Sequence, residues 1–131
     1  MGKTFQVSVT LPVKPEAIYE AWLDTKKHTA FTGSPAQVDA RTGGKFSAWD
    51  GYICGTNLEL VPYTRIVQSW RTKEFPDESP DSRIEVTLTQ TRNGTKLTLK
   101  HSNIPAGMEE EYKQGWKDFY LEPMKTYFGA D

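Results

Sequence analysis

The hydrophobic positions of this chain follow two different periods, and each period predicts a different kind of element. Near the start, apolar residues alternate with polar ones, which predicts a half-buried strand over residues 4–11. Near the end, large apolar residues recur at spacings of three and four, which predicts one buried face of a long helix. That face comprises Met108, Tyr112, Trp116, Phe119, Tyr120 and Tyr127. So broad an aromatic face requires an apolar partner, and strands can supply it.

The region between these segments is divided by turn signals. Pro15 is suited to the first residue of a short helix, and Asp24 can cap a second short helix that Gly33 and Pro35 end. Asp50-Gly51 and Asn93-Gly94 are strong hairpin signals. The predicted strands that follow are residues 36–41, 44–49, 52–61, 64–71, 82–91 and 95–103. This order predicts one α+β domain spanning residues 1–131, with a curved antiparallel sheet of six or seven strands wrapped around the long C-terminal helix. Pro123 should bend the last turns of that helix, because it lacks a backbone donor and crowds the carbonyl of Phe119.

Composition and charge exclude several classes of function. The 131 residues carry a formal net charge of −1, and neither half is basic, so we expect no nucleic-acid partner. No apolar run approaches the ~18 residues of a membrane span, and we expect a cytoplasmic protein. The single cysteine, Cys54, is expected to be a small core residue. His28 and His101 show no metal-ligand spacing, and no phosphate or dinucleotide motif opens a helix, so no cofactor is expected.

Polar residues on predicted inward faces are the best candidates for a site. Gln68 and His101 alternate with apolar neighbours on their strands, and Tyr52, Cys54, Leu58 and Leu60 are predicted to share one face. Two interpretations remain open: these polar groups converge on a small-molecule cavity, or they satisfy one another inside the core. The expected cavity lies between sheet and helix. Its candidate residues are Trp22, Phe46, Tyr52, Leu58, Gln68, Trp70, Leu99, His101, Trp116, Phe119 and Tyr120.

A set of short segments, in one order along the chain, carries a family resemblance. They are residues 31–36 (FTGSPA), 43–46 (GGKF), 50–51, 58–62 (LELVP), 66–71 (IVQSWR), 75–76, 104–105, 109–111, 115–116 and 127–129. Together they resemble the C-terminal domain of the activator of the heat-shock protein 90 ATPase, a member of the START-like, polyketide-cyclase-like superfamily. The resemblance implies a helix-grip fold over about residues 4–129. In two-domain members a separate N-terminal domain supplies most chaperone binding, and here the first predicted strand opens the chain.

Three functional hypotheses follow from the resemblance and the residues. The first is a non-enzymatic, stress-related binding module that contacts a chaperone of the heat-shock protein 90 type. The second is a carrier or sensor of a small hydrophobic ligand, with Gln68 and His101 orienting the ligand's polar end. The third is a cyclase or hydrolase with His101 as acid and base. No nucleophile is evident and no carboxylate is placed to orient His101, so we expect no enzymatic activity.

Overall fold

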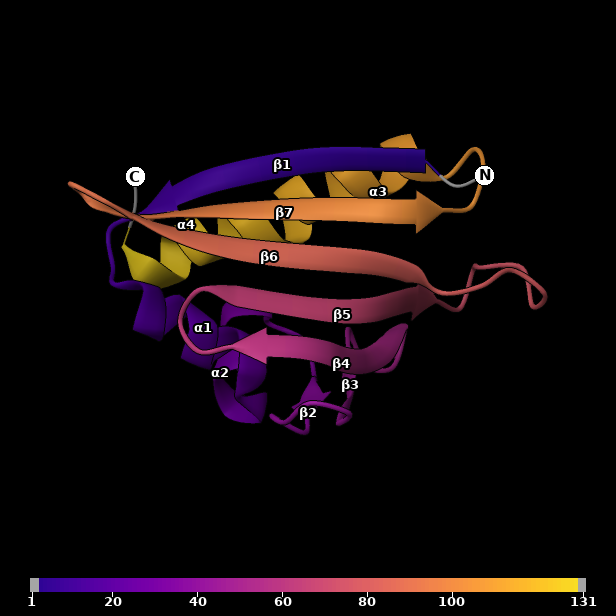
Figure 1. Cartoon of the computed structure of the whole chain (residues 1–131), viewed down its shortest axis with the longest axis horizontal. Helices are drawn as coiled ribbons and strands as arrows, with labels where there is room; N and C mark the ends of the chain where they lie inside the picture. The colour runs from indigo at the N-terminus through magenta and orange to yellow at the C-terminus, as the bar shows by residue number, and fades with distance from the viewer. Residues whose placement is uncertain (1–2, 130–131) are drawn as a thin grey trace.

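A seven-stranded antiparallel sheet forms the frame of the molecule, and the C-terminal helix lies along one of its faces (Figure 1). The strands are ordered β1-β7-β6-β5-β4-β3-β2. The computed structural model describes residues 3–129, so residues 1, 2, 130 and 131 of the predicted domain lie outside the described residues. The strands are β1 (Lys3–Leu11), β2 (Gln37–Val38), β3 (Lys45–Ala48), β4 (Ile53–Val61), β5 (Arg65–Thr72), β6 (Ser82–Thr91) and β7 (Gly94–Ile104). The predicted α+β fold with its helix-grip order of elements is confirmed.

Two short helices follow β1, as the sequence predicts. Helix α1 (Pro15–Leu23) begins at the expected proline, and α2 (Thr25–Thr32) is capped by Asp24, whose Oδ2 accepts a hydrogen bond from the Lys27 N–H at 2.8 Å. This side chain satisfies one of the free N–H groups of the first helical turn. Gly33 ends α2 with φ 78°, a left-handed conformation that glycine adopts without strain.

The long C-terminal helix is not regular throughout. It consists of α3 (Glu109–Trp116), a π-helical segment η1 (Lys117–Leu121) and α4 (Glu122–Phe128). The Glu122 N–H reaches the Lys117 carbonyl, five residues back, directly before Pro123, which has no N–H to donate. The helix is continuous through Pro123, with a π segment directly before it, and the predicted bend stays a prediction.

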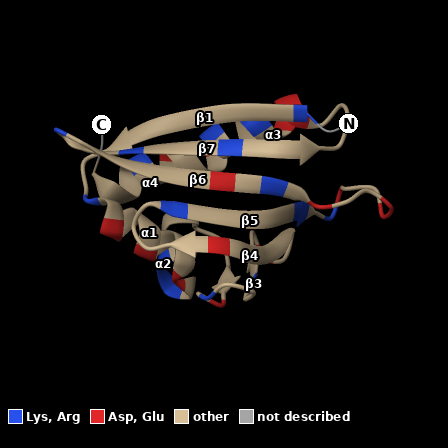
Figure 2. Cartoon of the chain, viewed as in Figure 1, with Lys and Arg blue, Asp and Glu red and all other residues tan. Residues whose placement is uncertain are grey.

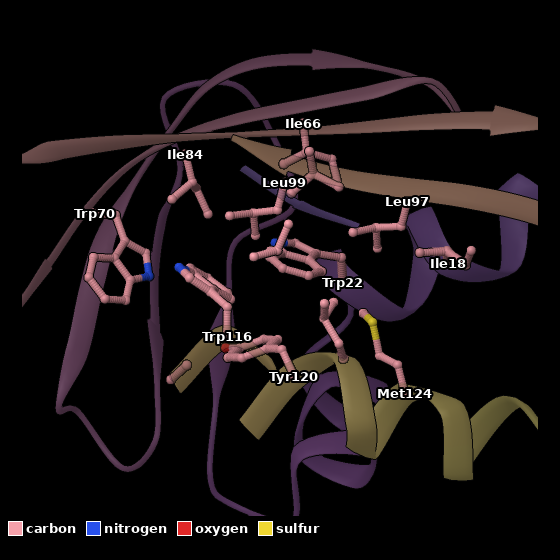
Figure 3. Close-up of a cluster of buried hydrophobic side chains, with 14 of the residues drawn as sticks. Ile18, Trp22, Ile66, Trp70, Ile84, Leu97, Leu99, Trp116, Tyr120 and Met124 are labelled. Carbon is pink, nitrogen blue, oxygen red and sulfur yellow. The ribbon is translucent and has the colours of Figure 1, made fainter. Parts of the chain in front are cut away.

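The face of this helix that packs on the sheet is dominated by aromatic and large apolar side chains (Figure 3). The buried members are Tyr112, Trp116, Tyr120, Leu121 and Met124. The prediction is wrong for Phe119 and Tyr127, which are 54% and 43% exposed. Both lie at the margin of the buried face, where spacing by threes and fours does not distinguish a core position from an overhanging one.

Strand β4 presents different residues to the core than the sequence predicts. Ile53 and Asn57 are buried, whereas Cys54 and Leu58 are exposed, Leu58 by 47%. The register with β5 shifts between Asn57 and Glu59, and this irregularity returns Leu60 to the inner face. An extra residue in one strand moves every later side chain to the other face. The predicted inward positions of Cys54 and Leu58 are therefore wrong.

Two expected hairpin features also change at their ends. Strands β2 and β3 are shorter than the predicted 36–41 and 44–49, because the Asn57 side chain, rather than a strand ladder, binds the carbonyls of Asp39 (2.8 Å) and Arg41 (3.0 Å). In the β6–β7 hairpin Gly94 is already paired with Thr91, so the turn lies one residue earlier than Asn93-Gly94.

One buried polar network fastens α1 to the sheet. The Trp22 indole Nε1–H donates to Gln68 Oε1 at 3.1 Å, and Gln68 Nε2 donates to Asn57 Oδ1 at 2.8 Å. Gln68 and Asn57 are each 1% exposed. A buried amide without a hydrogen-bond partner would carry a large desolvation penalty. These two hydrogen bonds avoid that penalty because they give the buried side chains partners inside the core.

A second network fastens the long helix to the sheet through His101. Trp116 Nε1–H donates to His101 Nδ1 at 3.0 Å, which requires that nitrogen to be unprotonated. His101 Nε2 lies 2.8 Å from Ser82 Oγ, which itself donates to the Trp70 carbonyl at 2.6 Å and therefore accepts from His101. His101 is held as the neutral Nε2–H tautomer. Burial lowers the pKa of His101 to about 3.

The different burial of Trp116 and Phe119 predicts different effects of their substitution on stability. Trp116→Ala should lower the free energy of unfolding by about 3–5 kcal/mol, because it removes a buried ring and the bond to His101. Phe119→Ala should cost less than about 1 kcal/mol, because its ring is largely exposed. Urea denaturation of both variants checks this, and similar losses would contradict the described orientation of the helix.

The His101 network predicts a pH dependence of stability. The folded-state pKa of His101 lies below the ordinary histidine value of 6.5, so the contribution of this residue to the free energy of unfolding is fully present above pH 6.5. That contribution falls as the pH drops toward 3. His101 alone should account for about 2 kcal/mol of loss between pH 7 and pH 5. Denaturant unfolding at both pH values should show that His101→Gln is less stable at pH 7 but loses less on acidification. An equal loss in both proteins would contradict a neutral buried imidazole.

Candidate functional site

A solvent-open pocket lies at one end of the interface between the sheet and the long helix. Its volume is about 340 Å³, which falls in the range of small-molecule sites. Strands β4 and β5, the β3–β4 turn, α3 and η1 supply its walls. Seven of the ten lining residues are aromatic. The lining comprises Trp49, Tyr52, Ile53, Trp70, Glu111, Tyr112, Gly115, Trp116, Phe119 and Tyr120.

Two aromatic rings from distant segments meet at the opening of this pocket. Trp49 and Phe119 pack edge to face, with ring centroids 5.4 Å apart. Trp49 has φ 53° and its neighbour Asp50 has φ 57°, a left-handed conformation that costs a non-glycine residue of this size. Phe119 belongs to the π segment, a feature that is frequent at functional sites. Local strain and helix irregularity therefore coincide at the pocket.

The polar part of the pocket is confined to its rim. Tyr52 Oη donates to Glu74 Oε1 at 2.8 Å, and the Tyr112 hydroxyl lies 2.7 Å from Thr72 Oγ1. Burial raises the pKa of the Tyr112 hydroxyl, the Thr72 hydrogen bond acts against this rise, and the charges of Glu74 and Glu111 add to it. Two carboxylates thus lie within electrostatic reach of one pocket hydroxyl.

Gly115 leaves space in the wall formed by α3. Glycine in the middle of a helix is less favourable than alanine by ~1 kcal/mol. A Cβ atom at this position would meet only Phe119 Cδ2, at 3.9 Å, which is an ordinary contact. No close approach of backbone or side chain therefore requires a glycine here. The absence of a side chain instead enlarges the pocket that Gly115 lines.

The structure divides the eleven predicted cavity residues into three groups. Five of them line the pocket, and they are Tyr52, Trp70, Trp116, Phe119 and Tyr120. Five others are buried in the core away from it, and they are Trp22, Phe46, Gln68, Leu99 and His101. Leu58 lies on the outer face of β4 and cannot take part. Gln68 and His101 satisfy tryptophan N–H groups, which corresponds to the second interpretation of their polarity.

Sequence reasoning missed half of the lining. Tyr112 and Gly115 lie near Trp116 on the predicted helix, so their position beside its buried face could have identified both as lining residues. Glu111 belongs to a run of three glutamates at the predicted helix start, where negative charge complements the helix dipole, so its sequence context does not indicate a pocket. Ile53 was missed because the face of β4 was misassigned, and the place of Trp49 depends on the left-handed turn that follows β3.

The remaining titratable side chains offer no alternative centre in the described part of the chain. The ring of His28 is buried: its Nδ1–H donates to the Trp22 carbonyl at 2.8 Å, and its Nε2 accepts from the Tyr120 hydroxyl at 2.9 Å. Burial lowers the pKa of His28. Within residues 3–129, no three His, Cys, Asp or Glu side chains gather where they could hold a metal ion, and no helix has the length and apolar character to cross a membrane.

Exposed charges of both signs are mixed over the molecule. Figure 2 shows lysine and arginine on some strands, aspartate and glutamate on others, and both signs on β6. The six ion pairs among the described residues all join side chains that are on average about one-third exposed or more, and such pairs contribute little to stability. The mixture leaves the rim of the aromatic pocket as the place where one sign of charge meets an apolar cavity.

Comparison with known proteins identifies the family. The model of the family described as "Activator of Hsp90 ATPase homolog 1-like protein" matches residues 12–129. The human activator of 90 kDa heat shock protein ATPase homolog 1 is 37% identical over 120 residues, covering 92% of this chain and 35% of that protein. The Saccharomyces cerevisiae Hsp90 co-chaperone AHA1 is 26% identical and is covered over 36% of its length. The chain thus spans about a third of the curated relatives it matches.

Solved structures agree with this assignment. PFC0360w, an HSP90 activator from Plasmodium falciparum, superposes with a TM-score of 0.89 at 32% identity, covering 98% of this chain and 97% of that one. CalU16 from Micromonospora echinospora has a TM-score of 0.77 at 24% identity, which shows the shared fold alone. With the family model matched over most of its length, the chain belongs to the activator of Hsp90 ATPase homolog 1-like family.

Proposed function

We propose that this chain is a non-enzymatic binding module that contacts a chaperone of the heat-shock protein 90 type. The observation that carries the proposal is the family match over residues 12–129. PFC0360w adds support, because a protein described as an HSP90 activator is covered over 97% of its chain by this one domain. A domain of this size is therefore a reasonable unit of chaperone recognition. A stress-related role and a cytoplasmic location stay predictions.

A titration against the heat-shock protein 90 of the source organism tests this proposal. We expect saturable binding, measured by calorimetry, in at least one of three states: without nucleotide, with ADP, or with a non-hydrolysable ATP analogue. The ATPase rate of the chaperone, measured in parallel, shows whether binding also activates it. CalU16 is a suitable control, because it shares the fold at only 24% identity. Absence of binding in all three states, or equal binding by CalU16, would contradict the proposal.

The aromatic pocket favours a second function, the binding of a small hydrophobic ligand. Its volume and its seven aromatic residues support this role. So does Gly115 in its wall, because no close contact there requires a glycine. The buried histidines do not support the enzymatic alternative, since both nitrogens of His101 are engaged and the ring lies outside the pocket lining. A ligand's polar end would meet the rim, not Gln68 or His101.

Substitution of Gly115 tests ligand binding in the pocket without removing a side chain from the core. We expect the neutral fluorescent probe N-phenyl-1-naphthylamine to bind the native chain with enhanced emission. Gly115→Leu should weaken binding at least about tenfold, because its side chain would occupy the pocket. Gly115→Ala is the matched control, and it should retain binding while raising the free energy of unfolding by about 0.5–1 kcal/mol. Unchanged probe binding by Gly115→Leu would show that the probe lies elsewhere.

A further inference from the structure

The walls of the pocket present π surfaces to whatever enters it. Trp49 and Phe119 meet at the opening, and the rings of Trp70 and Trp116 lie deeper, with centroids 5.5 Å apart. The face of an aromatic ring carries negative electrostatic potential and attracts cations, tryptophan most strongly. Three of the seven lining aromatic residues are tryptophans. This lining is suited to an apolar body and to a positive charge held against the rings.

The one charged side chain in the lining of the pocket is negative. Glu111 belongs to the lining, and Glu74 is bound to the lining residue Tyr52 at 2.8 Å. No lysine or arginine is among the ten lining residues. The first turn of α3 contributes three successive glutamates, which are visible as red ribbon in Figure 2. An anionic ligand would be repelled by the like charge at the entrance. A cationic ligand would replace its contacts with water by contacts with a carboxylate and with aromatic rings.

The helix dipole explains the acidic turn as a whole, and Glu111 differs from Glu109 and Glu110 in also bordering the pocket. Glutamates in a first helical turn stabilise the positive end of the helix dipole. Glu109 already does this and also accepts a hydrogen bond from the Gly107 N–H at 3.1 Å. Glu110 is exposed in the same turn but is not a lining residue, whereas Glu111 is. The pair provides a matched comparison, because both carboxylates lie near the dipole and only one borders the pocket.

We propose that the pocket selects lipophilic cations, meaning ligands with an aromatic or apolar body and a quaternary or protonated amine as head group. The body occupies the aromatic cavity, and the head group lies at the rim beside Glu111 and Glu74. This inference rests on the ligand-binding function proposed above and adds the sign of the ligand's charge. It is independent of any contact with a chaperone.

Three probes that share a naphthylmethyl body and carry head groups of different charge test the proposal. They are 2-naphthylmethyl-trimethylammonium, its neutral carbon analogue 2-neopentylnaphthalene, and the anionic 2-naphthylmethanesulfonate. Each is measured by displacement of N-phenyl-1-naphthylamine at pH 7 and low salt. We expect the cation to bind about 3- to 30-fold more tightly than the neutral analogue, and the anion to bind more weakly than both. The permanent charge of the ammonium removes any dependence on probe titration.

Two variants locate the source of this preference. Glu111→Gln should narrow the ratio between cation and neutral probe several-fold, with little change for the neutral probe. Glu110→Gln, the matched control, should leave the ratio unchanged. Equal affinities of cation and neutral probe would overturn the selectivity while leaving the pocket as a hydrophobic site. If no probe displaces N-phenyl-1-naphthylamine, or Gly115→Leu does not affect it, the ligand-binding function itself fails.

Discussion

The indole N–H of a buried tryptophan must find an acceptor, and this constraint organises the interior of the molecule. Trp116 stacks beside Trp22, with ring centroids 6.1 Å apart, at the centre of the interface between helix and sheet. Each ring directs its donor to the sheet, Trp116 to His101 and Trp22 to Gln68. Apolar burial supplies most of the driving force, but it does not set orientation. These two hydrogen bonds set the position of the long helix and of α1 relative to the strands.

The same constraint determines where ligand chemistry can occur. Because Gln68, Asn57 and His101 are engaged in the core, the polar groups of the middle of the sheet are not available to a bound molecule. The open pocket lies toward the end of the interface, and its polar groups come from the rim. A helix-grip architecture can thus keep a filled, well-satisfied centre and still retain a binding cavity at its margin.

The long helix combines rigidity with local irregularity at this margin. Pro123 removes a backbone donor, and the π segment before it lets the remaining hydrogen bonds continue. That segment also contains Phe119, whose ring extends over the pocket toward Trp49. Gly115, one turn before Phe119 in the same wall, leaves space there without a side chain, at a cost in helix stability. Features that weaken the helix therefore cluster where the cavity opens.

The sequence by itself determined the order of elements, the two helix starts, the aromatic face of the long helix and the family, because periodicity, caps and turn residues act locally. Only the tertiary structure decided which face β4 buries, since a single irregularity between Asn57 and Glu59 reverses it. It also decided that Trp22 binds Gln68, 46 residues away, and that the exposed side of Glu111 borders a cavity. Local patterns specify which elements form, but the exact buried face, the hydrogen-bond partners and the pocket walls depend on segments that meet only after folding.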